Sequence, residues 1–545
     1  MTKPPRTLAI VDAGGATLSV ALVGHLDGRW RLLGSLAGPA AIDEDALLAA
    51  IAERTASADP VLAAGLGLDA GSRADVPRLT ARSRPPGKLL VVGATERSLG
   101  LLMAEASRTS WHLISASPET HDPREMTELA LDGTVDAVLL GAGDPPGPDE
   151  RGALDDLAAL GVAAARRRPD LRFVLCGGIR DRRAWRAARA DDLDESRIVE
   201  VPAVAGRRGE EGLLRAALEG LRADPLDGRG AMRRSVASLA DLLDRRVELI
   251  EVGFDGGTRI LAEPGTGGGD PTTESVITAE GGLIPPEPGD DIIDGVLAWS
   301  TGNLDRHRLI DRLRELRIRP WADAAGDGAR LRLAAASAAL ARMAAVTEHL
   351  GSRPAPDLTI VAGGAFAGAP ASAIALAVAG TIRRPGATQL AWDHARLLGP
   401  IGTIDDPAER YALLADLARD ALVPLGTTFV AAASGSRQGL GRHGRGSVGR
   451  VDLAGDGLSM SRELAGDEVH FMDLPPGAVA RARFEFHDAV RLGRRTRSAE
   501  VEVTGGLAGL LVDLRAVPLR LPERRDRRRT MLAAWSELSW PGDDR

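Results

Sequence analysis

The sequence is poor in cysteine, in aromatic residues and in long apolar runs. Its single cysteine, Cys176, excludes an internal disulfide and a thiolate cluster for zinc or an iron–sulfur centre. Cys176 lies in the apolar run RFVLCGG, so we expect a buried and chemically inert thiol. No stretch approaches the roughly 18 apolar residues that a membrane helix needs, and the first residues lack the pattern of a signal peptide. We therefore expect a soluble, cytoplasmic protein without a membrane partner.

Metal-binding and nucleic-acid-binding patterns are also scarce. The nine histidines are scattered, with no His-x-x-x-His or His-Glu-x-x-His pair, so we predict no metal site built from protein side chains alone. A net charge of −8 gives no general attraction to nucleic acid, and an aromatic content of 3% leaves few stacking platforms for bases. The local arginine clusters are interpreted as solvated faces, and no nucleic-acid partner is expected.

What the sequence does contain is an α/β pattern. A length of 545 residues is enough for two or three domains, and 44% of the residues are hydrophobic. The chain opens on strand, glycine turn and strand (TLAIVD, AGGA, TLSVALVGH). Helices and strands then alternate, with helices expected at 43–57, 124–131 and 149–168 and strands at 88–92, 135–140 and 172–176. Such alternation indicates a mostly parallel sheet with helices on its faces.

Turn-rich and Gly-rich segments divide the chain. The segment ADPLDGRGA (Ala223–Ala231) separates a first half from a second half that begins again with a helix and a strand. After about Leu425 the composition changes. A Gly- and Arg-dense stretch (Ser434–Arg450) is followed by short alternating strands and a basic C-terminal helix. We predict a first lobe with an inserted α/β segment at 1–230, a second lobe at 231–425, and a β-rich domain with a basic tail at 426–545.

The first glycine turn carries residues suited to phosphate and magnesium. In DAGGATLS, Gly14 and Gly15 let backbone N–H groups approach an anion, and Thr17 adds a hydroxyl donor. Asp12, at the end of the strand, can hold Mg²⁺ through water. Taken alone, a Gly-Gly hairpin is more often only a turn.

Two further glycine loops follow apolar strands. The second is EVGFDGGT, in which Gly256, Gly257 and Thr258 are candidates for phosphate contacts and Glu251 or Asp255 for orienting an attacking water. The third is IVAGGAF, where the strand ends in Gly363 and Gly364. In isolation, the second loop is equally well explained as a structural turn.

The order and spacing of the three loops resemble the two-lobed actin-like ATPase superfamily, with its ribonuclease H-like lobes. Actin, sugar kinases and heat-shock chaperones share this arrangement. The resemblance implies ATP and Mg²⁺ between the lobes, with the adenosine packed on Gly363 and Gly364. The chain departs from the superfamily at Glu251, where an aspartate is usual, and at Phe254, where a small residue is usual.

Over roughly residues 5–425 the chain also resembles the MutL accessory proteins encoded beside cobalamin-dependent glutamate mutase, which are unrelated to the mismatch-repair protein of that name. The similar stretches are VDAGGATLS, ELALDGTVDAVLLGAG, VLCGG, RIVEVPAV, SVASLADLL, EHLGSRPAPDLTIVAGGAFA and TQLAWDHARLLGPIGTI, with Asp393 at that family's acidic position. TGGLAGLLVDLRAVPLRLP is similar to the C-terminal extension of longer members. The resemblance implies an ATP-binding accessory or reactivating chaperone, a weak ATPase or none, whose partner is a mutase subunit.

Two alternatives stay open beside the chaperone. Glu251, Phe254 and the altered glycines favour a non-catalytic nucleotide-binding or interaction scaffold that keeps the fold without turnover. A small-molecule kinase comes last, because no distinctive sugar-kinase signature is present. The Asp-x-His-x-x-Gly signature of base-off cobalamin binding does not occur either.

Overall fold

The computed structural model describes most of the chain, and the account below is confined to those residues. They are 6–68, 76–142, 147–189, 194–204, 212–222, 227–266, 269–285, 288–302, 304–320, 325–351, 355–433, 446–455 and 457–540. They form two compact units, which are described separately. One unit comprises residues 1–84, 226–275 and 281–545, and the other residues 85–225 and 276–280. None of the described helices is long and apolar enough to cross a membrane.

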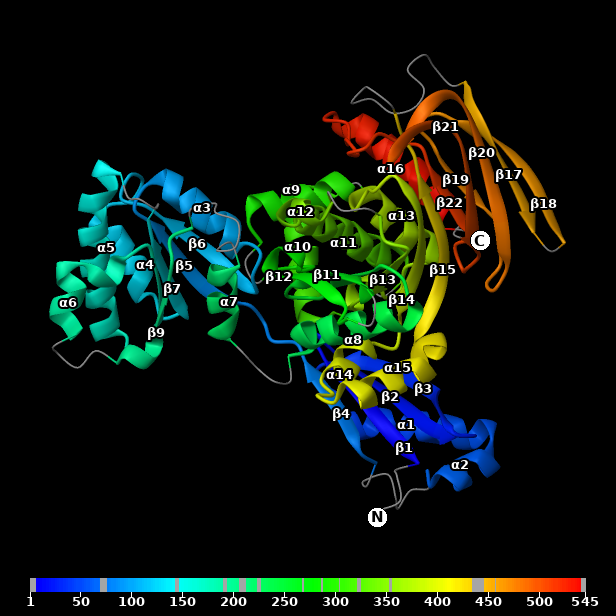
Figure 1. Ribbon diagram of the computed structural model, residues 1–545, viewed down its shortest axis with the longest axis horizontal. Coiled ribbons are helices and arrows are strands. Elements are labelled where there is room, and N and C mark those ends of the chain that lie inside the picture. Colours follow the sequence, from blue (N-terminus) through cyan, green and yellow to red (C-terminus); the bar gives the residue numbers. More distant parts are fainter. Residues whose placement is uncertain are drawn as a thin grey trace. The chain divides into compact units, whose positions relative to one another are not determined.

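The larger unit begins with a four-stranded sheet in the order β3-β2-β1-β4 (Figure 1). Its strands are β1 (Thr7–Ala13), β2 (Thr17–Leu26), β3 (Arg29–Pro39) and β4 (Arg78–Arg82). Two helices, α1 (Glu44–Ala58) and α2 (Pro60–Leu66), lie between β3 and β4 in the sequence. β1, β2 and β3 form an antiparallel meander, and β4 pairs parallel with β1. α1 packs on this sheet through buried leucine, isoleucine and alanine side chains.

A second sheet in the same unit repeats this order and extends it. The strands run β12-β11-β10-β13-β14-β15-β22-β19. Their bounds are β10 (Val247–Val252), β11 (Gly257–Glu263), β12 (Thr272–Thr278), β13 (Leu358–Ala362), β14 (Gly386–Asp393), β15 (Leu422–Val430), β19 (Val469–Met472) and β22 (Leu510–Asp513). β10 pairs antiparallel with β11 and parallel with β13, as β1 does with β2 and β4.

This repeated order, third-second-first-fourth with a parallel fourth strand, is the topology of the actin-like lobes. The predicted fold class, α/β with two actin-like lobes, is therefore confirmed. β10 and β13 are buried over their whole length, as expected for strands covered by helices on both faces.

A shared hydrophobic core joins the two sheets. Ile10 and Val23 of the first sheet pack in one cluster with Val236 and with Leu398 and Ile401. Val236 belongs to α8 (Gly228–Leu243), and the other two belong to α14 (Leu398–Gly402). The remaining helices of this region are α9 (Asp290–Trp299), α10 (Arg306–Ile318), α11 (Gly326–Val346), α12 (Glu348–Gly351), α13 (Ala371–Thr381) and α15 (Pro407–Ala421).

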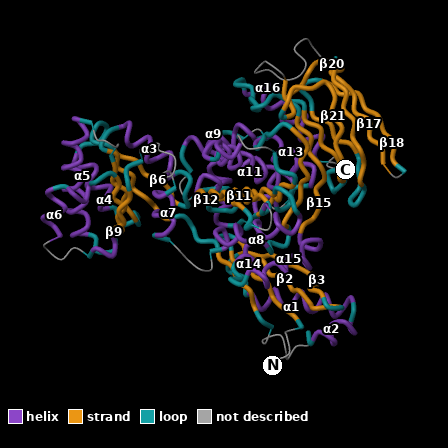
Figure 2. The backbone as a smooth tube through the Cα atoms, viewed as in Figure 1, coloured by secondary structure: helices purple, strands orange, loops and turns teal. Residues whose placement is uncertain are grey.

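The C-terminal part is rich in β-structure, as predicted. A five-stranded antiparallel sheet contains β16-β20-β17-β18, with β21 on β20, and Figure 2 shows it as one block of strands. The bounds are β16 (Ala432–Ala433), β17 (Ser447–Gly455), β18 (Leu458–Ala465), β20 (Val479–Leu492) and β21 (Arg494–Thr504). β15, β22 and β19 instead continue the second lobe's sheet. The last helix is α16 (Arg525–Ser539). The predicted boundaries at about 230 and 425 stay predictions.

The smaller unit is a five-stranded parallel sheet in the order β6-β5-β7-β8-β9. Its elements are β5 (Gly87–Gly93), α3 (Glu96–Ala106), β6 (Trp111–Ala116), α4 (Pro123–Leu131), β7 (Ala137–Gly141), α5 (Pro148–Arg167), β8 (Arg172–Cys176), α6 (Arg183–Arg189), β9 (Ile198–Val201) and α7 (Leu213–Gly220). This is the strand order of doubly wound folds of the flavodoxin type. The six elements expected from the sequence between 43 and 176 all form, within two residues of their predicted ends.

Cys176 is fully buried at the end of β8, which confirms the predicted structural thiol. Burial raises its thiol pKa to about 11, so almost no thiolate is present at neutral pH.

Candidate functional site

The first glycine turn joins β1 to β2. Asp12 lies opposite Ser19 near the end of the hairpin, and the N–H of Gly14 donates to the Thr17 carbonyl at 2.8 Å. Gly15 is exposed and has no room for a side chain, because a Cβ there would collide with a carboxylate oxygen of Asp255 from the second turn. The two turns therefore approach each other at Gly15.

The second glycine turn joins β10 to β11 at the corresponding place. Gly253 N–H donates to the Gly256 carbonyl at 2.9 Å, which closes the turn. Asp255 is 6% exposed and pairs with Arg317 at 3.0 Å. The same guanidinium lies 5.4 Å from the centre of the Phe254 ring. Asp255 is thus held by an arginine, and its role in orienting a water molecule stays a prediction.

The third loop follows β13 and contains a residue that must be glycine. Gly363 has φ +95°, which side-chain-bearing residues rarely adopt, and a Cβ there would collide with the Val252 carbonyl oxygen. At Gly364 a Cβ would lie 2.8 Å from Nη2 of Arg396. This close packing brings the third loop against the end of β10 and under the Arg396 guanidinium.

One pocket of about 520 Å³, including space open to solvent, collects most of the predicted site residues. Those lining it are Asp12, Gly14, Gly15, Thr17, Glu251, Gly363 and Gly364. Gly256, Gly257 and Thr258 are not among its lining residues. Gly257 packs against the Gly281 backbone, the Gly256 carbonyl accepts from Arg229, and Thr258 is fully buried. The role of these three residues in phosphate binding stays a prediction.

Three arginines in the pocket were not predicted as site residues. Arg229 comes from the start of α8, Arg332 from α11, and Arg396 from the turn between β14 and α14. Arg229 and Arg332 are 5% and 3% exposed, so both guanidinium groups are almost fully withdrawn from water. Each arginine comes from a separate segment, and no local sequence pattern links them.

Arg396 connects the lobes across the pocket. Its Nη1 donates a short hydrogen bond to the Thr17 hydroxyl, and its Nη2 lies over Gly364. Its backbone has φ +56°, a strained conformation for arginine. The turn is held by Asp393, whose buried carboxylate accepts from the N–H groups of Leu397 and Leu398 at 3.0 and 3.1 Å. Asp393 is therefore a structural cap beside the site.

Glu251 is paired with Arg229. Arg229 Nε and Glu251 Oε2 are 3.4 Å apart, and both side chains are 6% exposed. Burial raises the pKa of the Glu251 carboxyl to about 7, with Arg229 lowering it and the Asp12 carboxylate raising it. Burial also raises the pKa of Asp12, against the lowering effect of Arg396 and Arg229. Three guanidinium groups and two carboxyl groups give the pocket an excess of positive charge.

Within the described residues, no group of three or more His, Cys, Asp or Glu side chains could hold a metal ion. The predicted role of Asp12 in holding Mg²⁺ through water stays a prediction.

Comparisons with known proteins add little to this geometry. No protein-family model matches the sequence, and no curated protein matches it. Among solved structures, a Ppx/GppA family member from Aquifex aeolicus shows 10% identity over 75% of this chain and 86% of its own, with a TM-score of 0.18. A PilM–PilN type IV pilus biogenesis complex shows 14% identity, coverage of 77% and 99%, and a TM-score of 0.19. A carbohydrate kinase from Novosphingobium aromaticivorans shows 14% identity, coverage of 76% and 98%, and a TM-score of 0.20. Likenesses this low carry no functional argument, and the actin-like fold rests on the repeated strand order.

Proposed function

We propose that the pocket between the two glycine turns binds the phosphates of a nucleotide, ATP in the first instance, and that the protein works as a nucleotide-dependent binding switch with slow or no hydrolysis. The proposal rests on one observation. Residues of both glycine turns, the Gly363–Gly364 loop and three arginines line the same pocket.

The charge of the pocket suits a polyphosphate. Arg229, Arg332 and Arg396 outnumber the two carboxyl groups of the pocket, so an anion gains more there than in water. Arginine also provides several donors in a plane, which matches phosphate oxygens. In this proposal Thr17 releases Arg396 to the phosphates, and the N–H groups of Gly14 and Gly15 complete the cradle.

Magnesium would enter with the nucleotide. Asp12 lines the pocket and is partly exposed, so its carboxylate can accept hydrogen bonds from the ion's water ligands. The adenosine would pack on the Gly363–Gly364 backbone, where the absence of side chains leaves room. Arg396 covers Gly364 here, and its guanidinium has to shift for that contact to form.

The expectation of slow hydrolysis comes from Glu251. A carboxylate that positions an attacking water has to be ionised and free to accept a proton or a hydrogen bond. Glu251 has a pKa of about 7 and is paired with Arg229. This pairing favours the switch or scaffold over an efficient ATPase, and no observation favours a small-molecule kinase.

The finer proposal concerns the partner. The resemblance to the MutL accessory proteins supports a subunit of a cobalamin-dependent mutase of the glutamate mutase type, which the protein would bind, and reactivate, according to its nucleotide state. The test is a titration of the purified mutase subunit into this protein with ATP, with ADP and without nucleotide. Equal affinity in all three states, or no binding, would remove the chaperone and leave a nucleotide-binding scaffold.

The nucleotide itself is tested first, by calorimetry of ATP with Mg²⁺ on the intact protein and on Asp12→Ala. Arg308→Ala is a matched control, because Arg308 is 75% exposed on α10 and does not line the pocket. We expect binding by the wild type and by Arg308→Ala, with at least tenfold weaker binding by Asp12→Ala. Failure of the wild type to bind ATP, ADP or GTP would refute the proposal.

A further inference from the structure

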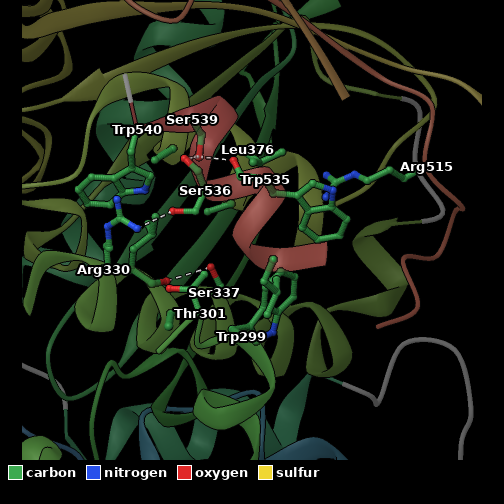
Figure 3. A pocket seen from close by; sticks show the side chains of 15 residues that line it. Trp299, Thr301, Arg330, Ser337, Leu376, Arg515, Trp535, Ser536, Ser539 and Trp540 are labelled. Atoms are coloured by element: carbon green, nitrogen blue, oxygen red, sulfur yellow. Dashed lines mark hydrogen bonds between the residues drawn. The ribbon is translucent and has the colours of Figure 1, made fainter. Parts of the chain in front are cut away.

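A second cavity of about 540 Å³, open to solvent, lies beneath the C-terminal helix α16. Figure 3 shows it between α16 and the helices of the second lobe, with Trp299, Trp535 and Trp540 around it. Leucine and alanine side chains from α11 and α13 complete its apolar walls. It shares no lining residue with the pocket between the glycine turns.

A buried cluster with an excess positive charge adjoins this cavity. Asp513, at the end of β22, is fully buried and pairs with both Arg383 and Arg515. The side chains of both arginines are 3% exposed. Two guanidinium groups and one carboxylate leave a net charge of +1, which is costly away from water unless an anion compensates it.

Arg515 belongs both to this charged cluster and to the wall of the cavity. Its Nε and Nη2 donate to Asp513 at 2.9 and 2.7 Å, whereas Nη1 is buried and has no hydrogen-bond partner within the described part of the chain. Its guanidinium lies 4.1 Å from the centre of the Trp535 ring, and Figure 3 shows it reaching over that ring. Arg515 lines the cavity, so the positive charge of its guanidinium acts on an anion bound there.

The rest of the cavity lining is also aromatic and positively charged. Arg330 lies 5.3 Å from the centre of the Trp540 ring and donates to the Ser536 hydroxyl at 3.1 Å. None of the described residues that line the cavity is acidic. The site therefore offers aromatic surfaces and a positive electrostatic environment.

We propose that this cavity is a binding site for a small aromatic carboxylate, with the carboxylate on Arg515 and the ring against the tryptophans. A single negative charge balances the Arg383–Asp513–Arg515 cluster. An aromatic ring gains dispersion and stacking contacts from Trp299 and Trp535. The proposal is independent of the nucleotide site.

The test compares benzoate with benzamide, its neutral isostere, by ligand-observed NMR and calorimetry on the full-length protein. We expect benzoate to bind at least tenfold more tightly than benzamide, since a charge-assisted hydrogen bond is worth about 1.5–3 kcal/mol. Equal affinities, or no binding of benzoate at millimolar concentration, would overturn the proposal. Displacement of benzoate by ATP would also overturn it, because the ligand would then occupy the other pocket.

Two variants localise the site. Arg515→Gln leaves a neutral Arg383–Asp513 pair and should abolish the preference for benzoate over benzamide. Ala377→Phe places a ring in the cavity from α13 while leaving the charged cluster intact, and should abolish binding of both ligands. Leu538→Phe, 52% exposed on α16 and not lining the cavity, is the matched control and should bind as the wild type does. If Arg515→Gln does not fold, Ala377→Phe alone tests the site. Unchanged benzoate binding by Ala377→Phe would refute the proposal.

Discussion

Arg396 donates a hydrogen bond to the Thr17 hydroxyl although 379 positions separate the two residues in the sequence. Thr17 begins β2 of the first lobe, and Arg396 follows β14 of the second. This contact places a cation over the first glycine turn, where a phosphate group would be held in the proposed function. In the proposed function, the Arg396 side chain would both contact the nucleotide and link the two lobes.

Replacing Arg396 should weaken nucleotide binding without unfolding the protein. Arg396→Asn is the informative change, because asparagine tolerates the left-handed backbone conformation found at this position. Loss of a charge-assisted contact of about 1.5–3 kcal/mol predicts roughly 10- to 100-fold weaker ATP binding by calorimetry. Arg308→Ala should leave the affinity unchanged. Tighter ATP binding by Arg396→Asn would mean instead that the guanidinium blocks the site.

Replacing Glu251 should change how stability depends on pH. Its pKa is raised from 4.5 to about 7 in the folded protein, so between these values the folded state holds a proton that the unfolded state has lost. Stability is then fully present below about pH 4.5 and falls as pH rises towards 7. One pKa unit corresponds to about 1.4 kcal/mol, so the fall is on the order of 3 kcal/mol.

The measurement is urea unfolding of the wild type and Glu251→Gln between about pH 5 and pH 8. Asp393, whose pKa burial raises to about 6, contributes a slope of the same sign in both proteins. The difference between the two profiles therefore reports Glu251 together with its effect on the nearby Asp12 carboxyl. Parallel profiles would contradict the raised pKa.

Replacing Asp12 should remove the magnesium dependence of nucleotide binding. Asp12→Asn keeps the shape of the side chain and removes the charge that attracts the ion's water ligands. We expect Mg²⁺ to strengthen ATP binding to the wild type and to have little effect on Asp12→Asn, while metal-free ATP binds both within a fewfold. A full Mg²⁺ effect in the variant would place the ion elsewhere.

The glycine turns around the pocket could be predicted from the sequence, whereas the arginines that give it positive charge could not. Asp12, Gly14 and Gly363 were recognisable because apolar strands run directly into glycines, and strand pairing then brings such turns to corresponding sheet ends. Arg229, Arg332 and Arg396 were missed because each comes from a different segment and only tertiary packing brings them together. Their side chains read as ordinary helix or turn arginines, since burial is not visible in a local pattern.

The second turn shows that the sequence does not reveal which turn residues line the pocket. The spacing in EVGFDGGT resembled a phosphate loop, but the tight closure between Gly253 and Gly256 and the register that pairs Glu251 with Thr258 leave Gly257 and Thr258 in the hairpin interior. Strand register depends on hydrogen bonds across the hairpin, which glycine content alone does not determine.

Gly363 should be the least replaceable of the predicted site glycines. Gly363→Ala forces an L side chain to φ +95° and drives its Cβ into the Val252 carbonyl, at the point where β13 leads into the third loop. Positive-φ strain alone costs on the order of 1–3 kcal/mol, and relief of the collision would shift the end of β10 beside Glu251. We expect a lower thermal midpoint together with weaker ATP binding.

The matched control is Gly65→Ala in helix α2 of the same unit, where a Cβ meets nothing within 4 Å. Alanine within a helix is better than glycine by about 0.5–1 kcal/mol, so this variant should be as stable as the wild type or slightly more so. Because both changes add one methyl group, a difference in thermal midpoint reports backbone conformation and contact rather than composition. Equal midpoints for the two variants would show that the third loop can relax around a side chain. The structure would then give no reason why the proposed adenosine contact at Gly363 requires glycine.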